Sequence, residues 1–427
     1  MPLPQILVQL SGEHVVGRLA IVNGTSYFEY DPAFIRSGHE LSPLHLPLQS
    51  GVFECRKPHL LNLPGLCFDS LPDDWGKKVA TRWFAARQTP GEIHPYELLC
   101  FVGPRGIGAL TYTPDLHAST PLRPALAEAL DLRLIEDSAS GIAANDANLP
   151  ELEKLAANGS AGGARPKMWA SIMEDPTGGP PRIVAGANKV PDGFSPYLLK
   201  FDLSTVESER REYGLAEHAY ALMARAAGIR IPDTKIIRST MPDGHVRSHF
   251  AIARYDRLAG NRRVHFHSFA GIAELDFDAP HDYRDLMEIT DRVTRDQREV
   301  REVFRRMVFN VLARVRDDHA KNHGFLYTPE APALQRWKLA PAFDVCFASP
   351  GHFLRHALSI AGEAVNPTKR HVLTLADEFS VNDAGAIIEE VSAAVAAWPT
   401  YAKNAGLSDR RANEIQSHQI PYAAFNG

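Results

Sequence analysis

The residues best suited to chemistry form a polar loop in the C-terminal half, Arg316-Asp-Asp-His-Ala-Lys-Asn-His323. Asp317 and Asn322 are five residues apart, the spacing at which kinase catalytic loops place their aspartate and their metal-binding asparagine. Asp344, in Ala342-Phe-Asp-Val345, is a second candidate metal ligand, and such hard oxygen ligands suit Mg²⁺. The spacing indicates phosphoryl transfer, in which positioning and charge neutralisation do most of the catalysis. An ordinary solvated turn is the alternative.

A lysine in an apolar strand is the candidate phosphate ligand. Lys200 lies in Pro196-Tyr-Leu-Leu-Lys-Phe201, where strand alternation places it on the same face as Leu198. Such a lysine must either reach solvent at an edge strand or pair with an anion, and both readings stay open. Glu217, at the border of an apolar helix stripe, is the favoured pairing residue, and three other glutamates compete with it: Glu207, Glu209 and Glu212.

A glycine-containing segment precedes this strand, Ser160-Ala-Gly-Gly-Ala-Arg-Pro-Lys167. Its backbone N–H groups are suited to wrapping phosphates. It has neither the Walker A pattern nor the G-x-G-x-x-G pattern of ordinary kinases, so a flexible linker is an equally good interpretation.

The surrounding pattern predicts an α+β protein. Residues 1–115 read as a small domain with strands between residues 5 and 30, an Asn23-Gly24 hairpin turn, helices at 74–87 and 95–100 and a strand at 108–112. Residues 116–158 read as a helical connector. Residues 159–427 read as a bilobal, protein-kinase-like domain, with a sheet lobe at about 159–256 and a helical lobe at about 257–427.

Within this kinase-like part, strands are expected at 167–173, 182–185, 197–201, 250–253 and 324–327. Helices are expected at 205–227, 296–315, 368–379, 383–398 and 408–417. Ser204 and Glu207 fit a capping box for the first helix, and Gly228 fits its end.

Composition excludes several classes of function. The chain has 427 residues, is 44% hydrophobic and carries a net charge of −5, from 46 basic and 51 acidic side chains. That balance gives no global attraction to nucleic acid or to an anionic membrane. The four cysteines form no C-x-x-C pair, which favours free thiols over disulfides or a metal site. With no signal-peptide pattern and no 18-residue apolar run, a cytoplasmic protein is expected.

The order of these signals along the chain predicts a kinase active site: glycine segment, strand lysine, helix glutamate, Arg254-Tyr255, Asp317 to Asn322, and Asp344. At this point the sequence resembles the HipA toxins of bacterial toxin–antitoxin pairs. In the N-terminal part the resemblance is carried by Gly17-Arg-Leu19, Phe28-Glu-Tyr30, Leu46-Pro-Leu48, Phe68-Asp-Ser-Leu-Pro-Asp73 and Gly108-Ala-Leu110. In the kinase part it is carried by Gly162-Gly-Ala-Arg-Pro-Lys167, Leu198-Leu-Lys-Phe201, Ala253-Arg-Tyr-Asp-Arg257, Asp317-Asp-His-Ala-Lys-Asn322 and Leu339-Ala-Pro-Ala-Phe-Asp344.

The resemblance implies a role for each matching position. Asp317 matches the catalytic aspartate, and Asn322 and Asp344 match the Mg²⁺ ligands. Ser160 falls at the serine whose autophosphorylation silences the family's kinases; a phosphate there adds about −2 charge beside Arg165 and Lys167. The nucleotide would be held by Gly162, Gly163, Ala164, Arg165, Lys167, Lys200, Ala253, Arg254, Tyr255, His319 and Lys321. Arg316 departs from the small polar residue that the family often has before the aspartate.

The resemblance also implies ATP and Mg²⁺ as cofactors. It implies a helix-turn-helix antitoxin resembling HipB as partner, with operator DNA contacted mainly through that antitoxin. A protein acceptor, such as an aminoacyl-tRNA synthetase, would be phosphorylated on a serine or threonine. Two alternatives stay open: a small-molecule phosphotransferase, and a non-catalytic partner of a helix-turn-helix repressor.

Overall fold

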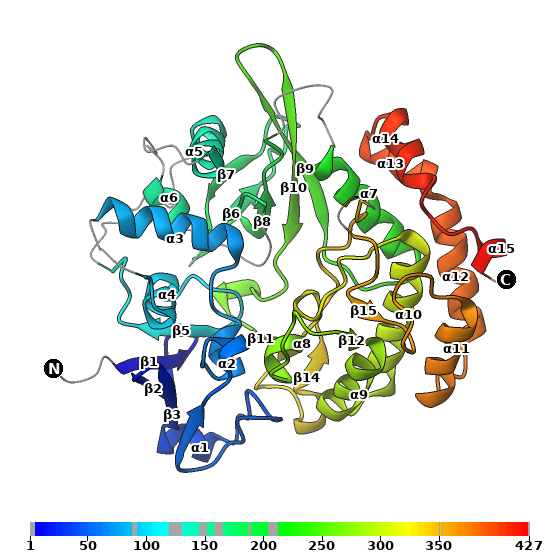
Figure 1. The fold of residues 1–427 in the computed structure, drawn as a ribbon. Helices are drawn as coiled ribbons and strands as arrows, with labels where there is room; N and C mark the ends of the chain where they lie inside the picture. The colour runs from blue at the N-terminus through cyan, green and yellow to red at the C-terminus, as the bar shows by residue number, and fades with distance from the viewer. Residues whose placement is uncertain are drawn as a thin grey trace. The chain divides into compact units, whose positions relative to one another are not determined.

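The computed structural model describes most of the chain, namely residues 5–87, 92–118, 130–144, 152–157, 165–186, 189–203, 212–349, 351 and 353–425. It is mixed helix and sheet, drawn as a ribbon in Figure 1. The chain divides into two compact units. The first comprises residues 1–203 and 237–267, and the second comprises residues 204–236 and 268–427.

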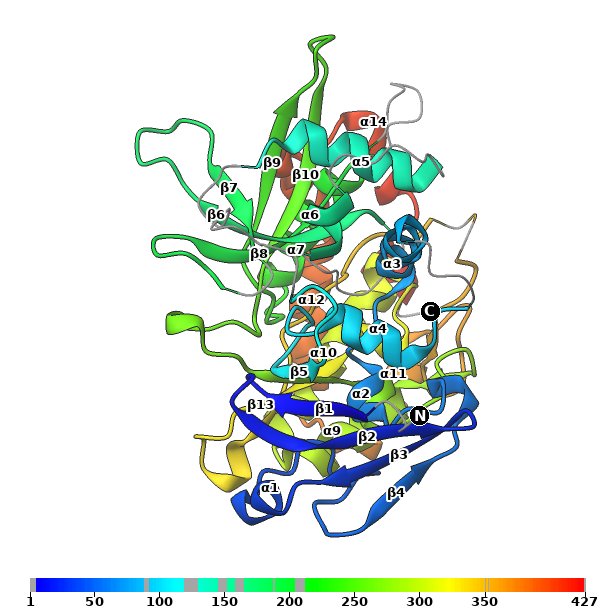
Figure 2. The same ribbon diagram turned by 90° about the vertical axis from the view of Figure 1, so that its left-hand side faces the viewer.

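The first unit begins with a five-stranded antiparallel sheet in the order β4-β3-β2-β1-β5. Figure 2 shows strands of this sheet lying side by side. The strands are β1 (Gln5–Leu10), β2 (His14–Val22), β3 (Thr25–Tyr30), β4 (Val52–Cys55) and β5 (Leu110–Thr113). Asn23 and Gly24 turn the β2–β3 hairpin with φ of 50° and 77°, as an Asn-Gly turn requires. The predicted hairpin is therefore confirmed.

Short helices follow the sheet strands in this part of the chain. They are α1 (Pro32–Ser37), η1 (Pro58–Leu60), α2 (Gly65–Phe68), α3 (Asp74–Ala86) and α4 (Pro95–Val102). The helices predicted at 74–87 and 95–100 are α3 and α4.

A second five-stranded sheet of the first unit has the order β7-β6-β8-β10-β9. Its strands are β6 (Lys167–Met173), β7 (Arg182–Ala185), β8 (Ser195–Lys200), β9 (Thr234–Thr240) and β10 (Val246–Ala253). Two helices of the predicted connector, α5 (Leu132–Ala144) and α6 (Leu152–Ala157), share one hydrophobic core with α3 and this sheet. Packing in that core holds in position the strands that carry Lys167 and Lys200, β6 and β8.

The second unit is mostly helical and is built around α10 (Gln297–Ala313), whose buried face includes Val303, Phe304 and Met307. Helices α9, α11 and α12 pack against α10, while α7 packs on α12 and α13. The helices are α7 (Tyr213–Ala226), α8 (Phe269–Ile272), α9 (Tyr283–Thr294), α11 (Lys369–Glu378), α12 (Ala384–Ala396), α13 (Trp398–Ala405), α14 (Asp409–Gln416) and α15 (Tyr422–Phe425).

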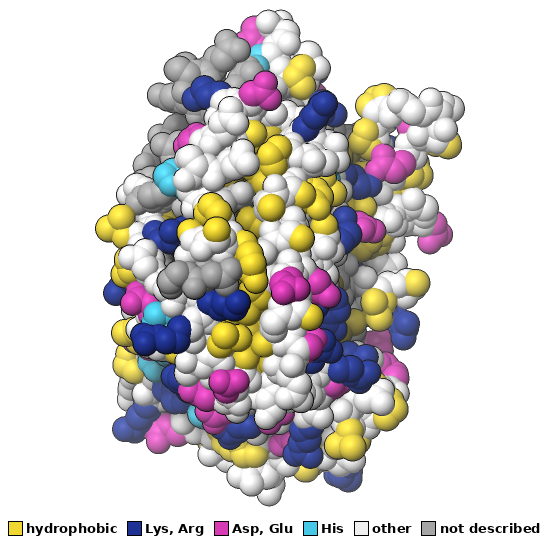
Figure 3. Space-filling model, turned by 90° about the vertical axis from the view of Figure 1, so that its right-hand side faces the viewer, with side chains coloured by type: hydrophobic (Ala, Val, Ile, Leu, Met, Phe, Trp, Pro, Cys, Tyr) yellow, Lys and Arg dark blue, Asp and Glu magenta, His cyan; other side chains and the backbone are white. Residues whose placement is uncertain are grey.

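Short strands and 3-10 turns complete the described chain: η4 (Ala259–Asn261), β11 (His265–Ser268), β12 (His281–Asp282), η5 (Ala320–Asn322), β13 (Gly324–Tyr327), η6 (Ala333–Gln335), β14 (Trp337–Leu339) and β15 (Leu358–Ser359). In the second unit, β13 pairs antiparallel with β14, and β12 pairs parallel with β15. On the face of the molecule seen in Figure 3, basic and acidic side chains are intermixed with hydrophobic ones. Among the residues described, no helix is long and apolar enough to cross a membrane.

The prediction of one continuous helix over residues 205–227 is wrong at Glu212, and residues 205–211 lie outside the described part of the chain. Glu212 has φ +47°, so helical backbone cannot pass through it, and α7 begins at Tyr213. The Glu212 carboxylate instead accepts a hydrogen bond from the backbone N–H of Ser408, the N-cap of α14. The predicted capping box at Ser204 and Glu207 lies outside the described residues.

Candidate phosphoryl-transfer site

A small recess in the second unit brings together the three residues that the sequence singled out for catalysis and metal binding. Asp317, Asn322 and Asp344 all line it, and its cavity volume is about 20 Å³. A volume of that size accommodates about one water-sized occupant, such as a metal ion. The recess forms where the loop after α10 meets the segment after β14.

The loop that carries Asp317 has a defined local structure. Helix α10 ends at Arg314, which adopts the left-handed conformation at φ 59°. The Asn322 side-chain amide then donates to the Asp317 carbonyl oxygen at 2.7 Å, closing the loop. Because that bond uses the amide nitrogen, the amide oxygen is left as the acceptor atom for a cation. The Asp317 carboxylate is 48% exposed, so it is accessible from solvent.

Asp344 lies in an unusual backbone conformation. Its φ is +53°, a left-handed value that is uncommon for residues other than glycine, although aspartate tolerates it better than most. Strain of this kind persists where the surrounding structure fixes it, often at ligand sites. Here it accompanies a carboxylate at the recess.

His319 and Lys321, the predicted phosphate-side residues, lie on the same loop. His319 Nε2 is 3.8 Å from the nearer Asp317 carboxylate oxygen. His319 Nδ1 accepts the Lys321 backbone N–H at 3.2 Å and caps η5. The Lys321 ammonium lies 4.2 Å from the ring centroid of Phe277, so an aromatic ring face lies against the cation.

The donor set of the recess fits Mg²⁺. It offers one amide oxygen and carboxylates, and within the described ranges no group of three or more His, Cys, Asp or Glu side chains forms a metal cage. Mg²⁺ is usually held by one or two carboxylates together with substrate phosphates and waters rather than by an all-protein cage. Asn322 and Asp344 are therefore sufficient protein ligands for a metal shared with a nucleotide.

A buried polar network lies directly behind Asp317. Asp318 is fully buried, and its carboxylate accepts hydrogen bonds from Tyr283 Oη at 2.9 Å and the Ala357 backbone N–H at 2.8 Å, and pairs with His356 Nδ1 at 2.9 Å. Asn310 donates in turn to Tyr283 Oη at 2.8 Å. Burial alone raises the pKa of the Asp318 carboxyl, but the His356 imidazole and these hydrogen bonds outweigh burial and hold that pKa below its usual range. Asp318 is therefore an ionised anchor.

His323, at the end of the loop, is a packing residue. Burial lowers its pKa to about 3, so the imidazole is neutral at physiological pH. Its ring packs edge-on against Tyr283 with centroids 5.8 Å apart. A neutral, buried histidine fixes the exit of the loop into β13 without adding charge to the recess.

In the first unit, the two predicted phosphate lysines differ in their surroundings. The Lys167 ammonium is buried and pairs with Asp73 at 3.1 Å, while its carbonyl accepts from Trp75 Nε1 at 2.9 Å. Its charge is thus already matched. Lys200 on β8 lies with its ammonium 5.7 Å from the ring centroid of Phe250, and its side chain is almost fully buried.

Three of the residues predicted to hold the nucleotide, Ala253, Arg254 and Tyr255, lie where β10 ends. Arg254 donates its backbone N–H to the Pro196 carbonyl at 2.9 Å. Its guanidinium is buried, stacks 3.7 Å from the ring centroid of Trp169 and pairs with Asp256 at 2.7 Å. That side chain therefore serves the interior of the unit.

Several predicted residues lie outside the part of the chain that the structure describes: Ser160, Gly162, Gly163, Ala164, Glu207 and Glu209. Arg165 is described and half-buried. Glu217 is buried on α7.

The first unit also contains an arrangement that resembles a hydrolase triad. His267 Nδ1 lies 2.5 Å from an Asp69 carboxylate oxygen, and His267 Nε2 lies 3.1 Å from Ser42 Oγ. The order of atoms is that of a Ser-His-Asp triad. However, Ser42 is completely buried, so no acyl substrate can reach its hydroxyl. The arrangement holds β11 to the chain around residues 42 and 69 and is structural.

Sequence reasoning missed the residues that support the loop: Tyr283, Arg316, Asp318 and His356. Arg316 and Asp318 flank Asp317, and the sequence shows that both are polar. The sequence carried no signal for their partners, because His356 lies 38 residues from Asp318 and Tyr283 lies 35 residues from it.

Comparison with known proteins identifies the class. Two family models match the chain: the HipA N-terminal domain over residues 7–113, and the HipA-like C-terminal domain over residues 159–398. The chain therefore belongs to the HipA family, as the sequence motifs predicted. No curated protein matches it.

Solved structures support the fold. The chain is similar to HipA from a Shewanella oneidensis MR-1 complex of HipA, HipB and operator DNA, with 14% identity and a TM-score of 0.64. That match covers 96% of this chain and 94% of the other. A Helicobacter pylori proinflammatory kinase, CtkA, matches 52% of this chain and 84% of its own at 12% identity, with a TM-score of only 0.33.

Proposed function

We propose that this chain is an ATP-dependent Ser/Thr protein kinase that acts as the toxin of a HipA–HipB-type pair. The observation that carries this proposal is the recess in the second unit, where Asp317, Asn322 and Asp344 meet. These are the three groups that kinase chemistry needs on its catalytic side: one acceptor-orienting carboxylate and two hard oxygen ligands.

In the proposed reaction, Asp317 orients the acceptor hydroxyl and takes its proton as the hydroxyl oxygen bonds to the γ-phosphorus of ATP. The bond from that phosphorus to the bridging oxygen breaks, and ADP leaves. Asn322 and Asp344 would hold Mg²⁺, which when bound neutralises charge on the β- and γ-phosphates. The exposure of the Asp317 carboxylate is consistent with a macromolecular acceptor, because a protein hydroxyl must be able to approach it.

On the nucleotide side, Lys200 is the proposed phosphate ligand, with Glu217 as the residue that pairs with it. Main-chain groups from Ala253 to Tyr255 would contact adenine. Lys167 is a weaker candidate than the sequence indicated, because its buried ammonium is paired with Asp73. Autophosphorylation at Ser160 is proposed as the step that silences the kinase, by placing about −2 charge in the glycine segment.

A helix-turn-helix antitoxin is the proposed protein partner. The similar Shewanella oneidensis HipA was solved with HipB and operator DNA, and the net charge of −5 of this chain favours operator contact through the antitoxin rather than through the kinase. An aminoacyl-tRNA synthetase is the proposed class of acceptor protein.

The test is a labelling experiment with purified protein, Mg²⁺, γ-labelled ATP and a bacterial lysate. One or a few proteins should be labelled on serine or threonine, and Asp317→Ala should reduce the rate by about 10²–10⁴-fold, the usual contribution of a positioned base. Asp291→Ala is the matched control, because Asp291 is an exposed aspartate on α9 of the same unit. Equal labelling by wild type and Asp317→Ala would refute the assignment.

Two other functions give different results in related assays. A small-molecule phosphotransferase would release ADP with a metabolite while labelling no protein. A non-catalytic partner of a repressor would show no thermal stabilisation by Mg·ATP, since a ligand that binds only the native state must raise its apparent stability.

A further inference from the structure

Arg316, the residue immediately before Asp317, has no part in the chemistry described so far. The kinase catalytic-loop pattern H-R-D also places an arginine directly before its aspartate. In kinases that are switched by phosphorylation, arginines pair with a phosphorylated residue of the activation loop and thereby order it. The partners of Arg316 in this chain are therefore informative.

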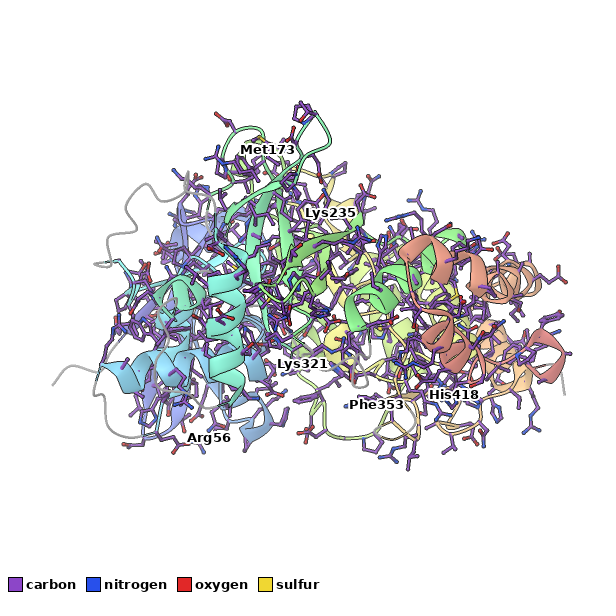
Figure 4. The ribbon with its side chains drawn as sticks, turned by 90° about the horizontal axis from the view of Figure 1, so that it is seen from above. Arg56, Met173, Lys235, Lys321, Phe353 and His418 are labelled. Atoms are coloured by element: carbon purple, nitrogen blue, oxygen red, sulfur yellow. The ribbon has the colours of Figure 1, made fainter. Side chains whose placement is uncertain are left out.

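The Arg316 guanidinium donates to main-chain carbonyls rather than to an anion. Nη1 donates to the Phe353 carbonyl at 3.2 Å and to the Leu354 carbonyl at 2.7 Å, while Nη2 donates to the Val365 carbonyl at 2.9 Å. One side chain thus binds both ends of the segment 353–365, which follows the metal-ligand candidate Asp344 in the chain. Figure 4 labels Phe353 at one end of this segment and Lys321 in the catalytic loop.

The same segment is tied to the loop from the other side of Asp317. The Ala357 backbone N–H donates to the Arg316 carbonyl at 3.1 Å and to the Asp318 carboxylate at 2.8 Å. His356 Nδ1 lies 2.9 Å from that carboxylate. Residues on both sides of the catalytic aspartate are therefore anchored to one segment.

The segment is also closed on itself, without any added charge. The His356 backbone N–H donates to the Ala364 carbonyl at 2.8 Å, and Ile360 and Glu363 exchange backbone hydrogen bonds of 2.9 and 3.1 Å. The Ser359 hydroxyl donates to the Asp282 carboxylate at 2.6 Å. These hydrogen bonds hold the segment in place without a phosphate group.

We infer that Arg316 is a positioning residue that fixes the segment 353–365 to the catalytic loop through main-chain carbonyls, so that Asp317 is held in place without phosphorylation of that segment. The catalytic consequence rests on the kinase function proposed above. The structural coupling does not, and it can be measured separately.

The first measurement is hydrogen–deuterium exchange of peptides covering residues 353–365 in the full-length protein. Arg316→Ala should accelerate exchange in this segment on the order of tenfold to a hundredfold, because several charge-assisted hydrogen bonds are lost at once. Arg316→Lys should do the same: an ammonium on a flexible stem cannot reproduce the planar fork that spans the three carbonyls. Arg355→Ala, which removes an exposed cation from the same segment, should leave exchange as in wild type.

Wild-type exchange in Arg316→Ala, or full rescue by Arg316→Lys, overturns the inference, since the fork geometry would then be irrelevant. Arg316→Lys keeps the charge and most of the stem, so it also provides a folded variant if the alanine protein proves unstable.

The second measurement is kinetic. Phosphatase-treated wild type should retain its labelling activity, and Arg316→Lys should lower kcat about tenfold or more while leaving the KM for ATP within about twofold. Loss of activity on phosphatase treatment, restored by phosphorylation within residues 353–365, overturns the inference. If wild type labels nothing, the proposed function fails. The exchange measurement still decides whether Arg316 fixes the segment 353–365 to the loop.

Discussion

Substitution of Asp318 tests whether the network behind Asp317 stabilises the second unit. Asp318→Ala removes the acceptor for two buried groups, Tyr283 Oη and His356 Nδ1, and one of the two acceptors of the Ala357 backbone N–H, which also donates to the Arg316 carbonyl. Each buried donor left unsatisfied costs about 1–3 kcal/mol. With two such donors, the expected loss is about 2–6 kcal/mol in the free energy of unfolding of that unit.

Asp318→Asn gives a smaller loss with a distinct pH dependence. The asparagine amide keeps one acceptor oxygen, but its NH2 group faces one of the hydrogen-bond donors that surround position 318. The free energy of unfolding should therefore fall by about 1–3 kcal/mol at pH 7. The pKa of Asp318 is lowered in the folded protein. Its ionised form therefore contributes stability that is present above the unfolded pKa of about 3.9 and is lost as the pH falls through the folded pKa. The stability gap between wild type and Asp318→Asn should narrow below about pH 4, as the Asp318 carboxyl becomes protonated.

The assay is urea denaturation, read by pulsed hydrogen exchange of peptides from α9 and α10, which report on the second unit alone. Asp291→Asn, an exposed change on α9, should fall within about 0.5 kcal/mol of wild type. A loss below about 1 kcal/mol for Asp318→Ala, or a gap that widens at acid pH, would refute the reasoning.

Three further outcomes follow from particular contacts. Asp344→Asn should abolish the thermal stabilisation by Mg·ATP and leave the unliganded Tm nearly unchanged, because asparagine tolerates the φ of +53° at this position; an unaltered ligand shift would remove Asp344 from the metal site. Lys167→Met and Asp73→Asn should each destabilise the first unit, with a coupling energy of about 1–3 kcal/mol in the double-mutant cycle. Additive losses would mean that the ion pair contributes nothing to the stability of this unit. Gly108→Ala should cost about 1–3 kcal/mol more than Gly244→Ala in thermal unfolding. Both glycines have φ near +80°, but a Cβ on Gly108 would lie 2.8 Å from a main-chain nitrogen of β11, whereas Gly244 faces open space. Equal losses would show that β11 moves to make room for the added Cβ.

Much of the local structure could be predicted from sequence, because local rules decide it. Short apolar runs bounded by turn residues predicted β2, β6 and β7, and the spacing of apolar residues in α10 predicted its buried face. The helix expected at 205–227 shows the limit of such rules. Its pattern runs on through Glu212, but that residue is left-handed and its carboxylate is committed to Ser408, 196 residues away.

For the loop that carries Asp317, too, the sequence determines some features and the tertiary structure determines others. Sequence alone determined the residue types and the five-residue spacing of Asp317 and Asn322, because both depend only on neighbouring positions in one loop. Only the tertiary structure decided that Asp344 joins them in one recess, that the Lys167 ammonium pairs with Asp73, and that Arg316 binds carbonyls rather than a phosphate. These partners lie tens of residues apart in the chain. Their pairing is set by how the helices and strands pack, and no periodicity or spacing encodes it.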